Sequence, residues 1–119
     1  MKNLSIDKGF PSIGYIVNNW PQTKNILKKF ILSNHKKPDL CSLAITCMHE
    51  LQVFKINSIK SVLIKCSKLC ARNISYNTYH DQHHFKSVLV ISCILAKHLS
   101  LNYRERVLLI FIALTHDMN

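Results

Sequence analysis

The stretch VLVISCILAKHLSLNYRERVLLIFIAL (residues 88–114) decides the fold, because apolar residues dominate it on both sides of the short link SLN. Its apolar periodicity predicts two helices, one over about residues 81–99 and one over about residues 103–116. A link of three residues between two such helices favours an antiparallel hairpin. The second helix contains the unbroken apolar run VLLIFIAL, so we expect it to be buried in the middle of a helical bundle.

Three further helices are predicted upstream of the hairpin, over residues 21–34, 39–53 and 57–73. Pro21 suits a first helical position, and Asp39 is a residue type that commonly caps a helix N-terminus. Two glycines and three prolines in 119 residues supply few turns, which also favours helices. With residues 1–20 expected to form an irregular N-terminal arm, the sequence predicts one helical domain over residues 21–119. The expected fold class is therefore all-α, a bundle of about five helices.

The apolar spacing also predicts which residues of the middle helices face the core. For the helix over residues 39–53 the expected face consists of Leu40, Leu43, Ala44, Cys47 and Leu51. For the helix over residues 57–73 it consists of Ile59, Val62, Leu63, Cys66 and Leu69.

Charge and cysteine content indicate a few broad properties. The formal net charge of +10 suits an anionic partner, such as a phosphate ester or a nucleic acid. Lysine supplies thirteen of the sixteen basic residues, so a compositional bias without any binding role is the favoured explanation of the charge. The five cysteines, which form no CxxC pair, are interpreted as reduced thiols of a cytoplasmic protein. No apolar run approaches the length of a membrane helix, and we expect no signal peptide and no membrane partner.

Two histidine-rich segments flank the hairpin, YHDQHHF (residues 79–85) and THDMN (residues 115–119). From His84 to the link the first helix rises roughly 22 Å, and the second returns by roughly 20 Å to His116. The two histidines should therefore lie at the same level, as neighbours. A divalent ion bound by His84, His116 and Asp117 would satisfy an otherwise costly buried carboxylate. The alternative is that Asp117 is simply exposed to solvent near the end of the chain.

The motif YHDQHH, an apolar helix pair and then LTHD resemble the HD superfamily of metal-dependent phosphohydrolases. The likeness is closest to its cyclic nucleotide phosphodiesterase branch. Tyr79 and His80 match the opening of that branch's Tyr-His-Asn-x-x-His signature, and His84 matches its second histidine. His116 and Asp117 match the His-Asp pair for which the superfamily is named.

The resemblance covers residues 76–119 and departs at Asp81, where that branch has asparagine. It implies that this segment forms the N-terminal part of an HD-like catalytic core. It also implies that His84, His116 and Asp117 bind divalent metal ions (Zn, Mg or Mn). His80 would be the general acid that protonates the leaving alkoxide, and Tyr79 would position the substrate. That substrate would be a phosphoester small molecule, with a cyclic nucleotide as the nearest case.

The family places a further metal-binding aspartate far downstream of the His-Asp pair, and further histidines directly after it. The sequence therefore leads us to expect a truncated piece of a longer enzyme, with an exposed apolar helix that promotes self-association. Two other functions stay open. One is a catalytically inactive helical protein that has kept the motif as a relic and acts by binding. The other is a basic bundle that binds nucleic acid, for which the charge is the one supporting feature.

Overall fold

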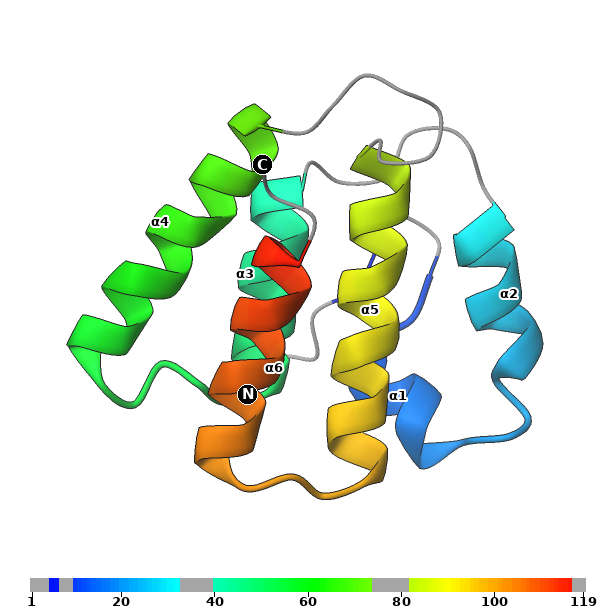
Figure 1. Cartoon of the computed structure of the whole chain (residues 1–119). Helices are drawn as coiled ribbons and strands as arrows, with labels where there is room; N and C mark the ends of the chain where they lie inside the picture. Colours follow the sequence, from blue (N-terminus) through cyan, green and yellow to red (C-terminus); the bar gives the residue numbers. More distant parts are fainter. Residues whose placement is uncertain (1–4, 7–9, 33–39, 74–81, 117–119) are drawn as a thin grey trace.

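The computed structural model describes residues 5–6, 10–32, 40–73 and 82–116, and over these residues the protein is all-α (Figure 1). The described residues contain no strand beyond a single antiparallel bridge between Ser5 and Ser12. The predicted fold class is thus confirmed. The helices are α1 (Ile13–Asn18), α2 (Lys24–Leu32), α3 (Leu40–Glu50), α4 (Asn57–Asn73), α5 (Gln82–His98) and α6 (Tyr103–Thr115).

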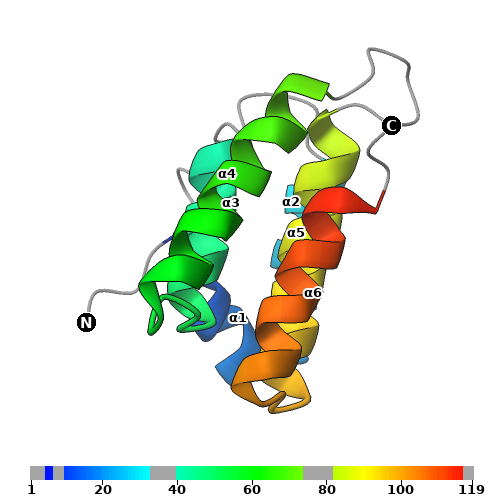
Figure 2. The same ribbon diagram turned by 60° about the vertical axis from the view of Figure 1, so that its left-hand side comes forward.

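The helices form two layers, with α3 and α4 in one and the antiparallel pair α5 and α6 in the other (Figure 2). The predicted hairpin is therefore present, and its turn lies beside the C-terminal end of α3 (Figure 1). Helix α1 packs against α5 near the same end, and α2 follows on the outer side (Figure 1). The hairpin is held mainly by α3 and α1 on one side and by α4 on another.

The core fills the space between the two layers. All five residues predicted for the inner face of α3 are buried, so that face is confirmed. From the hairpin, the buried apolar side chains are Phe85, Leu89, Val90, Cys93, Ile94, Ala96, Ile110, Ala113 and Leu114.

The N-terminal segment differs from the prediction of an irregular arm, because residues 13–18 form α1. The Ser12 hydroxyl caps this helix by accepting a hydrogen bond from the backbone N–H of Tyr15 at 3.1 Å. Ile13 and Ile16 are fully buried, so this short helix contributes to the core. The next helix begins at Lys24 and not at Pro21.

The predicted core face of α4 is confirmed in part, because Leu63 is buried and Ile59 and Cys66 pack partly buried against the core. Leu63 and Cys70 are buried together with Ser67, whose hydroxyl donates to the Leu63 carbonyl at 2.9 Å. Val62 and Leu69 are about half exposed. The buried face of α4 therefore includes Ser67, whose hydroxyl is hydrogen-bonded within the helix. Counting apolar residues in the sequence does not detect such a position.

The expectation that the second hairpin helix lies in the middle of the bundle is wrong for this structure. Ile110 and Leu114 of α6 are buried, whereas Leu108, Phe111 and Ile112 are 41–55% exposed. A helix that is apolar on every side has no polar stripe to indicate which side faces solvent. The contacts with α5 and α4 cover one side of α6 and leave the opposite side open.

Helices α3 and α5 end in the same way, with a Schellman motif. The N–H of Val53 donates to the Met48 carbonyl, and the N–H of Leu101 donates to the Ala96 carbonyl, both at 3.1 Å. The left-handed position of this motif usually holds glycine, but here Gln52 (φ 55°) and Ser100 (φ 52°) occupy it. Both helices therefore stop without the residue that normally marks such an end.

Replacing Ser100 by glycine should therefore stabilise the protein. Ser100→Gly removes the steric cost of a left-handed Cβ, which exceeds the entropy cost of glycine, so the free energy of unfolding should rise by about 0.5–1 kcal/mol. Urea unfolding followed by circular dichroism at 222 nm measures this change. The control is Lys65→Gly in the exposed middle of α4, which should destabilise by about 1 kcal/mol. Equal destabilisation by both substitutions would contradict the argument.

Candidate functional site

The open end of the hairpin, opposite its turn, brings two of the predicted site residues together. His84 lies in the first turn of α5, and His116 directly follows α6 as its C-cap. Their ring centroids are 5.9 Å apart, with the ring planes inclined by 53°. The juxtaposition of these two histidines, predicted from the helical rise, is confirmed.

His116 is held in a defined orientation. Its backbone N–H donates to the Ile112 carbonyl at 2.8 Å, and its ring Nδ1 lies 3.0 Å from the Ala113 carbonyl. Because a carbonyl can only accept a hydrogen bond, Nδ1 must be the donor in this contact, and Nε2 then carries the lone pair of the neutral ring. Histidines that bind metals are commonly oriented in this way by a backbone carbonyl.

Phe85 completes a small aromatic cluster at this end of the hairpin. The ring is buried, 5.2 Å from that of His116 and 5.9 Å from that of His84, measured between centroids. Sequence reasoning singled out the histidines but missed this phenylalanine, although it directly follows them in the sequence. The contact gives both imidazoles an apolar wall on one side, which restricts where a ligand can approach.

The arrangement of the two imidazoles fits a shared metal ion. Bonds of about 2.0–2.1 Å to two ring nitrogens place the ring centroids roughly 5–6.5 Å apart, depending on the angle at the metal. The observed 5.9 Å falls within this range. His116 also lies at the C-terminal end of α6, where the partial negative charge of the helix favours a cation. The first turn of α5 carries the opposite partial charge, so side-chain ligands must provide most of the affinity.

The other predicted site residues lie outside the described residues. These are Tyr79, His80 and Asp117. Among the residues that the structure does describe, no three His, Cys, Asp or Glu side chains form a group suited to holding a metal ion. The described part of the candidate site is therefore the pair of histidines and Phe85.

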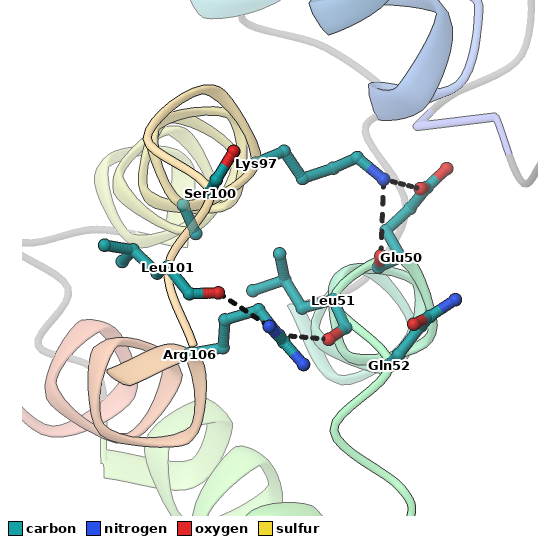
Figure 3. A pocket seen from close by; sticks show the side chains of 8 residues that line it. Glu50, Leu51, Gln52, Lys97, Ser100, Leu101 and Arg106 are labelled. Atoms are coloured by element: carbon teal, nitrogen blue, oxygen red, sulfur yellow. Dashed lines mark hydrogen bonds and ion pairs between the residues drawn. The ribbon is translucent and has the colours of Figure 1, made fainter. Parts of the chain in front are cut away.

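A second candidate site is a cleft of about 230 Å³ at the turn end of the hairpin (Figure 3). It lies where the C-terminal ends of α3 and α5 meet the start of α6. Its charged members come from all three helices, and Figure 3 shows their side chains directed toward backbone or partner groups. The lining residues are Glu50, Leu51, Gln52, Ala96, Lys97, Ser100, Leu101 and Arg106.

The charges in this cleft are occupied in holding the fold together. Arg106 donates from Nε to the Leu51 carbonyl at 2.7 Å and from Nη1 to the Leu101 carbonyl at 2.6 Å. Lys97 pairs with the Glu50 carboxylate at 3.2 Å, and that carboxylate also accepts the N–H of Gly14 at 3.3 Å. Cations placed at two helix C-termini are stabilising, so we interpret the cleft as structural.

The Arg106 contacts should contribute strongly to stability. Arg106→Ala leaves two backbone carbonyls without their cationic donor, which should lower the free energy of unfolding by about 1.5–3 kcal/mol. Thermal and urea unfolding would measure the loss. Arg104→Ala is the matched control, because Arg104 is exposed on the same helix, and surface changes of this kind stay within about 0.5 kcal/mol. Similar losses in both variants would refute this role of Arg106.

Two of the buried cysteines, Cys70 and Cys93, are not candidates for nucleophiles in this structure. Burial, followed by the neighbouring Cys66, raises the pKa of Cys70 to about 11. A hydrogen bond with Cys47, together with burial, raises the pKa of Cys93 well above its usual value. Reactive cysteines need a lowered pKa to form the thiolate, so these two thiols pack the core.

The raised pKa of Cys70 predicts a loss of stability at alkaline pH. The unfolded chain releases this proton near pH 9 and the folded chain near pH 11, so stability is unaffected below pH 9 and falls between these values. At pH 11 the free energy of unfolding should be lower than at pH 8 by about 2–3 kcal/mol because of this group. Urea unfolding from pH 8 to 10.5 should show a shallower decline for Cys70→Ala than for the parent chain. Parallel declines would be inconsistent with this assignment.

Comparison with protein-family models, with curated proteins and with solved structures finds no match to this chain. The relationship to the HD superfamily therefore stays a proposal that depends on the motif and on the histidine pair. A separate finding concerns membranes: over the described residues, no helix combines the length and the apolar character needed to cross one.

Proposed function

We propose that the open end of the α5–α6 hairpin binds a divalent metal ion through His84 and His116, with Asp117 as a third ligand. We further propose that the protein is an HD-type metal-dependent phosphohydrolase, or part of one. The observation that carries the proposal is the 5.9 Å separation of two imidazoles contributed by different helices. The His116 ring, oriented by the Ala113 carbonyl, supports it independently.

The proposed chemistry is phosphoester hydrolysis. A bound divalent ion would polarise the phosphoryl group and lower the pKa of a bound water, supplying hydroxide near neutral pH. His80 would donate a proton to the leaving alkoxide, and Tyr79 would position the substrate. A small phosphoester, with a cyclic nucleotide as the first case to test, suits the basic chain. We place the protein in the cytoplasm, in keeping with its five free thiols.

A non-enzymatic helical binding protein is the second candidate function. The observation that favours it is the packing of His116 on Phe85, with centroids 5.2 Å apart. This contact gives the histidine a structural role that needs no metal. On this alternative, the histidine pair would be a remnant of a catalytic site and the exposed helix faces would be the active part of the molecule.

The metal proposal predicts that divalent ions bind weakly and that His84 and Asp117 are both required. Titration of the chain with Zn²⁺, Mn²⁺ and Mg²⁺ by isothermal calorimetry should show binding of one ion, since three ligands leave open positions on a single metal. His84→Ala and Asp117→Ala should each weaken binding at least tenfold, and the double variant should abolish it. His49→Ala is the matched control, because His49 is an exposed histidine that packs on Phe54 away from this end.

An activity assay then separates the two candidate functions. The parent chain and His84→Ala are compared for hydrolysis of a cyclic nucleotide and of a generic phosphodiester, with each metal present. Slow turnover that disappears in His84→Ala supports the enzyme, and we expect it to be slow because a two-metal site needs more ligands than this set provides. Metal binding without any turnover favours the binding protein. Equal metal binding by the double variant and the parent chain would show that these residues do not form a metal site.

A further inference from the structure

The outer face of the hairpin is defined here as Ile91, Leu95, Leu99, Leu108, Phe111 and Ile112. All six are 36–65% exposed. Ile91 and Leu95 of α5 and Leu99, which directly follows that helix, recur every four residues. On α6, Phe111 and Ile112 lie three and four residues after Leu108. Each set therefore forms a continuous stripe along its own helix.

The two stripes point to the same side of the hairpin. Cys93 of α5 contacts α3, since its thiol donates to the Cys47 carbonyl at 3.7 Å. Ile91 and Leu95 are each two residues from Cys93, about 200° around the helix, and so face away from α3. Arg106 of α6 reaches the Leu51 carbonyl just beyond α3, and Leu108 is two residues further along, about 200° around the helix. The stripes together thus cover the side of the hairpin that lies opposite α3, the helix behind it in Figure 1.

The levels of the stripes also match along the hairpin. Counting from the turn end, Leu95 lies about 4.5 Å along α5 and Leu108 about 7.5 Å along α6, at 1.5 Å per residue. By the same count Ile91 lies at about 10.5 Å and Ile112 at about 13.5 Å. The side chains therefore alternate between the two helices and form one surface.

The area of the outer face is that of half an interface. The exposed fractions of the six side chains add up to about the surface of three fully exposed residues. At about 150–250 Å² for each large side chain, this amounts to roughly 500 Å² per molecule. Two such faces would bury about 1,000 Å², which is the lower limit for a specific protein interface.

The charge distribution indicates what kind of partner fits this face. On the described surface the exposed lysines gather on α2, on α4 and in the segment that precedes α4, namely Lys24, Lys28, Lys29, Lys55, Lys60, Lys65 and Lys68. In the hairpin, Lys97 is paired with Glu50 and Arg106 with backbone carbonyls. An acidic partner or an anionic membrane would need a cluster of cations around the apolar face, whereas the exposed charged residues of α6 are Arg104 and Glu105, one of each sign. A neutral apolar face is complementary to itself.

We propose that the outer face of the hairpin is the interface of a two-fold symmetric homodimer, in which two hairpins pack into a four-helix bundle. A two-fold axis presents the same face from both molecules, which suits an apolar surface beside which the exposed charges of α6 balance. The net charge of +10 on each molecule opposes the approach at long range. Dimerisation should therefore become stronger as salt screens this repulsion.

Sedimentation equilibrium of the whole chain, over a range of concentrations and at 0.05–0.5 M NaCl, tests the proposal. The parent chain should form a discrete dimer whose dissociation constant falls as salt increases. Leu108→Lys should weaken the dimer at least tenfold, because it places two like charges in a desolvated interface. Leu108→Gln removes the apolar side chain without adding charge and should weaken it in the same direction.

The matched control is Val62→Lys, which adds the same charge at a position on α4 that is 51% exposed and outside the outer face. Its dimer should match that of the parent chain, and circular dichroism should show unchanged helicity in all variants. Three results would overturn the proposal: a monomer at every concentration, aggregates of no fixed size, or equal weakening by Val62→Lys. A monomer that floats with phosphatidylserine vesicles would instead make this face a lipid-binding surface, and the dimer would be rejected.

Discussion

The position of the hairpin depends on the contact of Arg106 with the ends of two other helical segments. Its guanidinium joins the Leu51 carbonyl, just beyond α3, to the Leu101 carbonyl in the hairpin turn. A planar group with several fixed donors suits this bridge better than an ammonium would. The Tyr103 hydroxyl adds a second tie by donating to the Val53 carbonyl at 3.0 Å. Because the turn is fixed against α3, the levels of all residues further along α5 and α6 are set, including those of the two histidines.

The hairpin was predictable because two long apolar segments flank a link too short for any other connection. Helix α1 was not, because six residues containing Gly14 give no periodic signal, and the helix depends on the Ser12 cap and on Glu50, which is distant in sequence. The ends of α3 and α5 carry no glycine, so sequence reasoning lacked its usual marker there. The capping box that starts α6, formed by Asn102 and Glu105, did have a recognisable N-x-x-E pattern, which we missed.

The candidate site also has features that the sequence predicts and features that it does not. The meeting of His84 and His116 follows from counting helical rise along two arms of nearly equal length, which requires no side-chain detail. The orientation of His116 does require it, because the Ala113 carbonyl is available only where α6 ends. The burial of Phe85 was missed, although Val88 and Leu89 follow it at the three- and four-residue spacing of a helix face. Arg106 and Glu50 were missed because their partners are mainly backbone groups and not other side chains.

The two ends of the hairpin differ in which side chains are available to bind a ligand. At the turn end, Glu50, Lys97 and Arg106 are engaged with one another's helices, and converging helix C-termini disfavour any anion. At the open end, two imidazoles from different helices lie within the reach of one ion, against an apolar wall. A phosphoester is an anion. At the turn end the helix C-termini disfavour an anion, and Lys97 and Arg106 are already engaged in contacts within the protein. On the proposed function, the open end is therefore the better suited of the two ends, and a bound metal would supply positive charge there.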